Sequence, residues 1–360
     1  MQFSIRLNSS ETFLQSPKFV VPSGECVPIV NGFLEISDIG PEIDIQKQVW
    51  RQMAKARKLP MEYRGFIRYD GFLVLDGKGG FKIRIIEING RGIECLHAIE
   101  AVHQALGREV EIESTAQIAL PYFQKWAGDK EIIALVADNE SLVKRIWGPI
   151  FVRGLQNLGL RIRLMEVGEF RDKADTCFKG TCMYLVGDVG DGPSQFPGDV
   201  ARRLWNLQEE GGVSMLNRIM RGGMGDKYAL ERIIGLGPLL LNEPDKFTVA
   251  RDKQSDLVLK PINGASGDGI TIGRLVSPDD WREALTRESQ THFLSELVVP
   301  ETIELHGVKY AVDCNITYWA EGGKLTPLYV IARIKPWEKF RKTWIMNVAK
   351  GGGIVPPKRL

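Results

Sequence analysis

Residues 65–89 read GFIRYDGFLVLDGKGGFKIRIIEIN, and they carry the clearest structural pattern of the chain. It contains two apolar runs, residues 65–75 and 81–89, joined by the glycine-rich segment DGKGG. Runs rich in aromatic and β-branched residues on either side of such a turn predict a β-hairpin. Strict alternation along the second strand predicts that Glu87 and Asn89 share one face with Phe81, Ile83 and Ile85.

Three side chains with oxygen donors lie on these two strands: Asp70, Glu87 and Asn89. Mg²⁺ prefers oxygen ligands, and in nucleotide sites it uses few protein ligands besides phosphate oxygens. Arg68 lies two residues before Asp70 and therefore on the same face, where a guanidinium suits a phosphoryl group or an acyl phosphate. Taken alone, charged residues in strands are more often solvated or paired. The metal interpretation therefore depends on the rest of the chain.

A second candidate site follows residues 256–260, which predict a strand that is closed by Pro261. Lys260 at its end is placed to reach a phosphate. The loop NGASGDG at residues 263–269 has three glycines, which let backbone N–H groups approach the same oxygens. In this loop we single out Asn263, Gly264, Ser266 and Gly267. The loop lacks the Gly-Lys-Ser or Gly-Lys-Thr ending of a Walker sequence, and a simple hairpin turn is the alternative.

Two further motifs lie toward the end of the chain. Residues 293–300, FLSELVVP, form an apolar strand with a short hinge, which suits an adenine read by backbone groups. An ordinary core strand is the alternative. Arg333 and Lys335 lie two apart on a predicted strand, and three successive glycines follow at residues 351–353. Such glycines indicate unusual backbone freedom or close approach to a ligand, with a basic surface and a loose tail as the alternative.

The middle of the chain has a different pattern. Strands are predicted at residues 131–137, 161–165 and 183–186, with a helix at 140–158, which together indicate an open α/β domain. The region has no GxGxxG, so we expect no dinucleotide site there. Other predicted helices span residues 45–58, 96–106, 226–234 and 278–286, and a second hairpin joins residues 308–320 to 325–335. We expect three parts, at residues 1–125, 126–215 and 216–360.

The composition limits the classes of partner. The chain has 47 basic and 45 acidic residues and a net charge of +2, which gives no reason to expect binding to nucleic acid or to an anionic membrane. It has no apolar run long enough to span a membrane and no apolar run at its start, so we expect a cytoplasmic protein. The five cysteines include no CxxC pair, which favours free thiols in a reducing compartment.

In their order along the chain, these motifs resemble the ATP-grasp superfamily. The resemblance is to the eukaryotic-type glutathione synthetases and the synthetase domain of glutathionylspermidine synthase, in which the strand with the metal ligands comes early, as if circularly permuted. The segments that carry it are Arg68-Tyr69-Asp70, Ile86-Glu87-Ile88-Asn89, Gly225-Asp226-Lys227, Val258-Leu259-Lys260-Pro261, residues 294–300, Arg333-Ile334-Lys335 and Gly351-Gly352-Gly353.

The resemblance implies an α/β (α+β) ATP-grasp fold with an inserted open parallel α/β substrate domain and a glycine-rich lid. Family members carry a glutamate in the lid loop as a further metal ligand, but here that position falls near Gly264. In this chain, either Asp268 or Asn263 replaces that glutamate as a metal ligand, or Asp70 is enough without a ligand from the loop. The resemblance implies that Asp70, Glu87 and Asn89 bind Mg²⁺ and that Lys227 and Lys260 contact the nucleotide phosphates. It implies that the backbone of Glu296 and Val298 recognises adenine and that Lys335 approaches the nucleotide. Arg68 and Arg333 are implied to contact the carboxylate substrate or its phosphate.

The implied activity is that of an ATP-dependent carboxylate–amine ligase. Such an enzyme uses ATP and Mg²⁺ to form an amide or peptide bond through an acyl phosphate, on a small amino-acid, peptide or polyamine-type substrate. Relatives in that family are often homodimers. The altered lid loop motivates one alternative, a non-catalytic ATP-binding module, and a small-molecule kinase is another. The motifs do not specify the acid or the amine.

Overall fold

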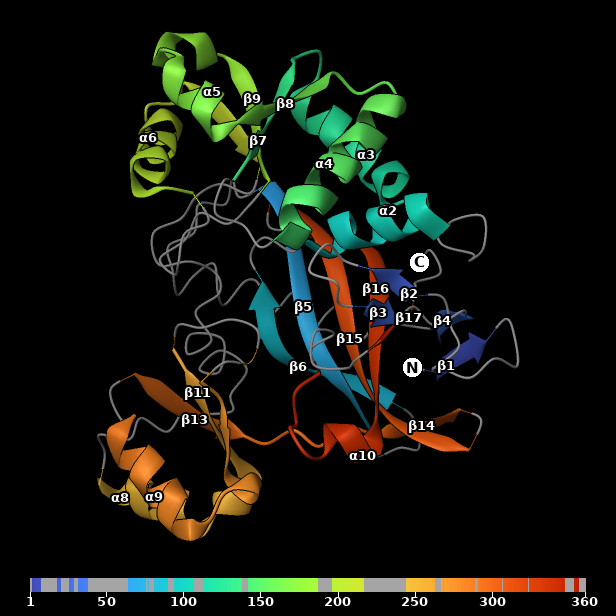
Figure 1. The fold of residues 1–360 in the computed structure, drawn as a ribbon, viewed down its shortest axis with the longest axis vertical. Coiled ribbons are helices and arrows are strands. Elements are labelled where there is room, and N and C mark those ends of the chain that lie inside the picture. Colours follow the sequence, from blue (N-terminus) through green and yellow to red (C-terminus); the bar gives the residue numbers. More distant parts are fainter. Residues whose placement is uncertain are drawn as a thin grey trace.

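A computed structural model describes most of the chain (Figure 1). The expected helices at residues 45–58 and 226–234 lie outside the described residues, as do Lys227, Asn263, Gly264, Ser266 and Asp268. The described residues are 2–7, 18–20, 26–28, 32–37, 64–75, 77, 81–89, 94–106, 113–137, 142–186, 196–216, 244–262, 267, 269–288, 291–305, 307–322, 324–346 and 353–355.

The largest sheet runs in the order β17-β16-β15-β5-β6, with β14 paired to β15, and all its pairs are antiparallel. Both predicted hairpins are confirmed as β5–β6 and β15–β16. The pairing of β5 with β15 joins the front of the chain to its rear. The strands are β5 Arg64–Leu75, β6 Phe81–Asn89, β14 Thr302–Leu305, β15 Val308–Glu321, β16 Lys324–Pro336 and β17 Gly353–Val355.

A β-bulge in β6 corrects the predicted alternation. Asp70 pairs with Glu87, but Gly71 pairs with Ile85, so Ile86 is the extra residue. Glu87 therefore does not share a face with Ile85, contrary to the sequence prediction. The bulge requires glycine at position 71, because a Cβ there would lie 2.5 Å from Ile83 Cγ2 and 2.8 Å from the Arg84 carbonyl oxygen. The bulge thus turns Glu87 toward the face that carries Asp70.

The middle region forms a four-stranded parallel sheet in the order β10-β9-β7-β8. Its strands are β7 Ile132–Val136, β8 Ile162–Glu166, β9 Thr181–Val186 and β10 Val213–Leu216. The sequence predicted the first three strands and missed β10. Alternate residues of β7 pack on opposite sides, Ile132 and Ala134 in one core and Ile133 and Leu135 in another, because both faces of the sheet are covered.

Helices cover both faces of this parallel sheet. Helices α2 Glu94–Leu106, α3 Thr115–Ala127 and α4 Leu142–Asn157 contribute to the first core, and α5 Val167–Asp172 and α6 Gly198–Glu209 to the second. The first core also contains Phe66 and Trp319 of the large sheet. The layer of α2, α3 and α4 therefore lies between the parallel sheet and one end of the large sheet, as Figure 1 shows. The sequence missed α3, α5 and α6.

A small sheet, in the order β12-β11-β13, lies at the other end of the large sheet. Its strands are β11 Leu257–Pro261, β12 Thr271–Ile272 and β13 His292–Glu296. Helices α8 Pro244–Asp252 and α9 Pro278–Arg287 pack on one face through Leu257, Leu259 and Leu294. The other face packs against the large sheet, because Val258 and Ile272 share a core with Phe72 and Ala311.

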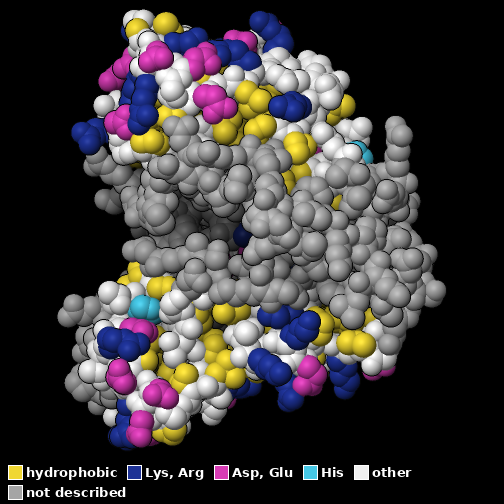
Figure 2. All heavy atoms as spheres, in the orientation of Figure 1, with side chains coloured by type: hydrophobic (Ala, Val, Ile, Leu, Met, Phe, Trp, Pro, Cys, Tyr) yellow, Lys and Arg dark blue, Asp and Glu magenta, His cyan; other side chains and the backbone are white. Residues whose placement is uncertain are grey.

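The remaining described elements are short. Near the start of the chain, β1 Gln2–Leu7 pairs with β4 Gly32–Ser37, and β2 Lys18–Val20 pairs with β3 Cys26–Pro28. Helix α10 Trp337–Phe340 follows β16. Among the described residues, we find no helix with the length and apolarity needed to cross a membrane. Figure 2 shows one face of the molecule, on which basic and acidic side chains are interspersed.

Candidate active site

Polar side chains gather on one face of the large sheet, between two apolar cores. Along β5 this face carries Phe66, Arg68, Asp70 and Phe72 in turn, because alternate residues of a strand point the same way. Phe66 belongs to the core of the α2–α4 layer and Phe72 to the core beneath the small sheet. The pair Arg68 and Asp70 therefore lies between these two cores.

The register of neighbouring strands extends this arrangement across the sheet. Asp70 lies opposite Glu87 of β6 and opposite Asn315 of β15, and Arg68 lies opposite Thr317. Directly opposite residues of neighbouring strands share a face. We call the resulting set the polar strip; it consists of Arg68, Asp70, Glu87, Asp313, Asn315, Thr317 and Arg333.

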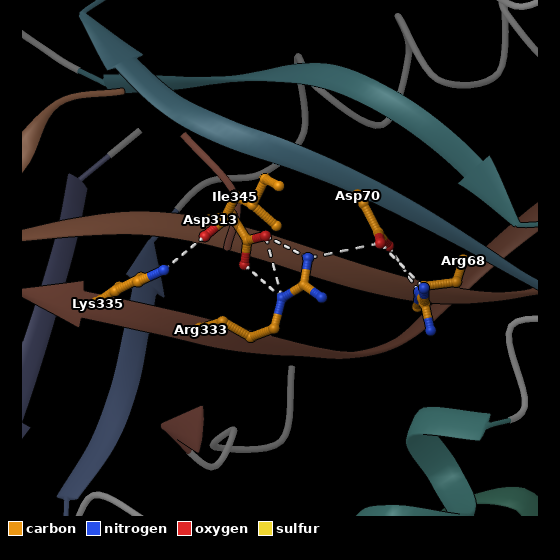
Figure 3. Close-up of polar contacts among 6 residues, drawn as sticks. All are labelled: Arg68, Asp70, Asp313, Arg333, Lys335 and Ile345. Atoms are coloured by element: carbon orange, nitrogen blue, oxygen red, sulfur yellow. Dashed lines mark hydrogen bonds and ion pairs between the residues drawn. The ribbon is translucent and has the colours of Figure 1, made fainter. Parts of the chain in front are cut away.

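Two arginine–aspartate pairs form the centre of the polar strip (Figure 3). Arg68 donates from Nε to Asp70 Oδ1 at 2.6 Å and from Nη2 to Oδ2 at 3.0 Å. Arg333 donates from Nε to both oxygens of Asp313, at 2.9 and 3.0 Å, and from Nη2 to Oδ2. Arg333 Nη2 also lies 3.6 Å from Asp70 Oδ2. Bidentate pairs of this kind fix the plane of each guanidinium, so the two carboxylates orient the two arginines.

Burial affects the two partners of the second pair differently. The carboxyl of Asp313 is fully buried, and this desolvation raises its pKa to about 6 although Arg333 opposes the shift. The pKa of Arg333 is raised: desolvation acts to lower it, but the carboxylates of Asp313 and Asp70 outweigh that effect. At neutral pH the pair is therefore charged, and the carboxylates of Asp313 and Asp70 stabilise the charge of Arg333.

Replacement of Asp313 by asparagine should change how stability depends on pH. In the folded chain the pKa of Asp313 is about 6, above its ordinary value of 3.8, so folding favours its protonated form. The resulting stabilisation is present below about pH 4 and is lost as pH rises through about 6. Urea unfolding at a series of pH values should therefore show the variant gaining stability relative to wild type as pH rises, with a plateau above about pH 7.

The control for this comparison is Asp172→Asn, which changes an exposed carboxylate at the end of α5. That variant should differ from wild type by a small amount that shows no comparable rise through pH 6. A pH-independent difference between wild type and the Asp313 variant would contradict the assignment of a raised pKa to this carboxyl.

Lys335 is buried beside the polar strip and is held by the segment that follows α10. Its Nζ donates to Thr343 Oγ1 at 3.1 Å. It also donates to the carbonyl oxygen of Ile345 at 3.0 Å, as Figure 3 shows. Ile345 in turn lies against the predicted lid loop, because a Cβ at Gly267 would be 3.1 Å from Ile345 Cγ2. The backbone φ of Gly267 is +78°, a value that favours glycine. Residues 343–345 thus connect Lys335 to the described part of the loop.

Lys260 comes from the small sheet. It has the same parity along β11 as Val258, which packs against the large sheet, and the opposite parity to Leu257 and Leu259, which pack against the helices. The strand therefore directs Lys260 to the side of the small sheet that faces the large one. This is the side on which the polar strip lies.

The predicted adenine hinge lies on an edge of the small sheet. Among the described residues, β13 pairs only with β11. Leu297 N donates to the Asp256 carbonyl oxygen at 2.8 Å, so Leu297 and Asp256 form a hydrogen-bonded pair of the antiparallel ladder. The next pair, Glu296 with Leu257, is then a non-hydrogen-bonded one, and the backbone N–H and C=O of Glu296 point away from β11.

The side chains around the hinge hold it in place. The carboxylate of Glu296 accepts a hydrogen bond from Arg84 Nη2 of β6 at 2.5 Å, which links the small sheet to the large one. Val298 is buried in the core between the two sheets. Glu301 N donates to the Leu73 carbonyl oxygen at 2.7 Å. The strand itself is shorter than predicted, ending at Glu296.

The oxygen atoms of the side chains around Glu87 are of the type that Mg²⁺ binds. Asp70 and Glu87 occupy opposite register positions, and Asn89 lies opposite Arg68; its side chain is outside the described part of the structure. No group of three or more His, Cys, Asp and Glu gathers as a metal site among the described residues. Oxygen donors on two strands nevertheless match an ion that takes most of its ligands from phosphate and water. Metal binding by Asp70, Glu87 and Asn89 stays a prediction.

The structure thus brings together Arg68, Asp70, Glu87 and Arg333, with Lys335 beside them. Sequence reasoning missed Asp313, Asn315 and Thr317. A signal for them was present, because they alternate with Val312, Cys314 and Ile316 in a strand that was predicted correctly. Polar residues at every second position of an apolar strand indicate one polar face.

No protein-family model and no curated protein matches the chain. Among solved structures, it is similar to a glutathione synthetase-like effector from Globodera pallida, with a TM-score of 0.44 and 9% identity over 87% of this chain and 80% of that one. It is also similar to a protein described as a candidate gamma-glutamylcysteine synthetase from Methylobacillus flagellatus, with a TM-score of 0.46 and 14% identity over 89% of each chain. Similarity at this level leaves any functional proposal to rest on the site's own side chains.

Proposed function

We propose that this chain is an ATP-dependent carboxylate–amine ligase of the ATP-grasp type. The observation that carries the proposal is the meeting of two distant parts of the chain on one sheet face. Arg68, Asp70 and Glu87 come from the front, and Asp313 and Arg333 come from the rear. The small sheet with Lys260 packs against the same face. Cations and oriented carboxylates are groups that phosphoryl transfer from a nucleotide uses.

The proposed reaction has two steps. The carboxylate oxygen of the acid attacks the γ-phosphorus of ATP, and the bond to the β,γ-bridging oxygen breaks, which gives an acyl phosphate and ADP. The nitrogen of the amine then attacks the acyl carbon and expels inorganic phosphate, and after loss of a proton the product is an amide. Activation as a phosphate supplies the leaving group that a free carboxylate lacks.

The residues have separate roles in this proposal. Arg68 and Arg333, each held by a bidentate aspartate, orient the carboxylate and stabilise the charge on the transferring group. Lys260 contacts the phosphates of the nucleotide, and the backbone of Glu296 and Val298 reads the adenine edge. Glu87 and Asn89, with Asp70, would hold Mg²⁺, which supplies neutralisation of phosphate charge when bound. Lys227 and the loop residues Asn263, Gly264, Ser266 and Gly267 complete the proposed nucleotide contacts.

An assay of ADP and phosphate release tests the proposal. The full chain with Mg²⁺ and ATP should form ADP when a pool of amino acids, short peptides and polyamines is added. Mass spectrometry should find a product whose mass equals one acid plus one amine minus water. A phosphorylated acid that accumulates whether or not amine is present would identify a kinase instead. ATP binding without ADP formation for any acid would identify a non-catalytic module.

A further inference from the structure

Two side chains of the polar strip have buried polar atoms without a hydrogen-bond partner in the described part of the chain. Asn315 is 1% exposed and Thr317 is fully buried. Neither the amide nitrogen nor the amide oxygen of Asn315 has a hydrogen-bond partner among the described residues, and the same is true of Thr317 Oγ1. Leaving such groups unpaired in a protein interior is costly, and most buried polar atoms are satisfied. These three atoms therefore require an explanation.

A buried carboxylate elsewhere in the described structure has its hydrogen bonds satisfied. Glu100 is 2% exposed, and its carboxylate accepts hydrogen bonds from Ser114 Oγ at 2.8 Å, from Ala116 N at 3.0 Å and from Gln104 Nε2 at 3.0 Å. The two arginine–aspartate pairs beside Asn315 and Thr317 are likewise matched to each other. Among the described residues, a buried atom without a hydrogen-bond partner also occurs away from the strip, as at Trp344 Nε1, but within the polar strip such atoms belong to Asn315 and Thr317.

Their place in the strip indicates which substrate they face. Along β15 the face carries Ala311, Asp313, Asn315, Thr317 and Trp319 in turn. Ala311 packs in the core beneath the small sheet, and Trp319 packs in the core of the α2–α4 layer. Asn315 and Thr317 therefore lie farther from the small sheet than Asp313 does, and they are level with Asp70 and Arg68. At this level the reacting carboxylate is expected to meet the transferring phosphate, so we expect the pair to contact the part of the acid next to its carboxylate.

The chemistry of the pair restricts the group that it binds. An asparagine amide offers an acceptor and two donors, a threonine hydroxyl both donates and accepts, and neither carries a charge. Asn315 lies opposite Asp70, and Thr317 lies opposite Arg68, so the pair adjoins the arginine that is expected to hold the reacting carboxylate. A neutral group that both donates and accepts hydrogen bonds, placed close to a carboxylate, matches this arrangement.

We propose that Asn315 and Thr317 form a specificity subsite that selects acids carrying a hydroxyl or an amide near the carboxylate over aliphatic acids of the same shape. The proposal rests on the proposed ligase function for the identity of the acid as substrate. A site built to hydrogen-bond such a group discriminates strongly against an apolar analogue, because the analogue leaves the site's buried polar atoms unpaired. The subsite therefore determines substrate choice, while Arg68 and Arg333 hold the group common to all acids.

The test uses two pairs of acids with matched shapes: lactate with isobutyrate, and N-acetylglycine with isocaproate. Each acid is titrated calorimetrically into the full chain saturated with Mg²⁺ and a non-hydrolysable ATP analogue. The polar member of at least one pair should bind at least about tenfold more tightly than its apolar twin. The pair that shows the preference distinguishes a hydroxyl from an amide. Equal affinities within both pairs, or no measurable binding of either polar acid, would overturn the proposal.

The variants Asn315→Leu and Thr317→Val assign the preference to these residues. Each should remove most of the preference for the polar acid. Each should also leave the melting temperature of the unliganded chain unchanged or higher, because no hydrogen bond is lost and an unpaired group is removed. A lower melting temperature with an unchanged preference would show a structural role and overturn the proposal. Thr326→Val, at an exposed position of β16, is the matched control and should change neither quantity.

The calorimetric readout separates this inference from the ligase proposal. If the chain binds acids with the expected preference but forms no ADP, the subsite stands and the ligase proposal fails. If ADP forms and the two variants keep the wild-type preference, the ligase proposal stands and the subsite fails.

Discussion

Glu87→Ala should lower ADP formation by at least about a hundredfold, because metal stabilisation of phosphoryl transfer is worth several kcal/mol. Glu87 lies opposite Asp70 across the bulge in β6. The bulge turns Glu87 toward the face that carries Asp70, and its side chain is partly buried there. We therefore expect Glu87 to contribute strongly to Mg²⁺ binding.

The measurement is the rate of ADP formation at saturating acid and amine, with circular dichroism and melting temperature as checks of folding. Glu304→Ala is the matched control, because Glu304 is an exposed glutamate on β14 of the same sheet. It should retain wild-type activity. Because a weaker metal site is filled at higher metal concentration, Glu87→Gln should recover part of its activity as Mg²⁺ is raised. A Glu87→Ala chain with full activity would remove the residue from the site.

Lys260→Ala should reduce kcat/KM for ATP by about a hundredfold, because its ammonium neutralises phosphate charge that grows during transfer. The argument for its position is structural. Lys260 shares the parity of Val258, which packs against the large sheet, so its side chain leaves β11 toward the polar strip. The small sheet therefore directs Lys260 toward the face on which we propose that the nucleotide binds.

The kinetics should be measured with ATP as the varied substrate. Lys260→Arg should recover only part of the lost activity, because a guanidinium differs from an ammonium in shape and hydration. Lys253→Ala changes an exposed lysine between α8 and β11, and as the control it should behave as wild type. Should Lys260→Ala bind and use ATP as wild type does, β11 does not face the nucleotide and the proposed geometry is wrong.

Several parts of the site could be predicted from local sequence patterns. The hairpin at residues 65–89 was predicted correctly, because apolar alternation and a glycine-rich turn are both local signals. The same holds for the strand that ends at Lys260 and Pro261 and for the hairpin that carries Arg333. The features that sequence reasoning missed are those without a clear local pattern. The bulge at Ile86 leaves no period-2 trace, and α3 contains Pro121, which weakens a helix signal.

Local sequence patterns are enough to place the two hairpins of the large sheet and, away from bulges, to show which of their residues share a face. Arg68 and Asp70 belong together because they are two apart, and Asp313, Asn315 and Thr317 belong together for the same reason. That these two groups meet is seen only in the folded chain. The pairing of β5 with β15 joins residues far apart in the chain, and alternation fixes the face of a strand without fixing its neighbour or register. The pairing of Arg333 with Asp313 and the place of Asn315 opposite Asp70 therefore follow from register, which the folded sheet sets.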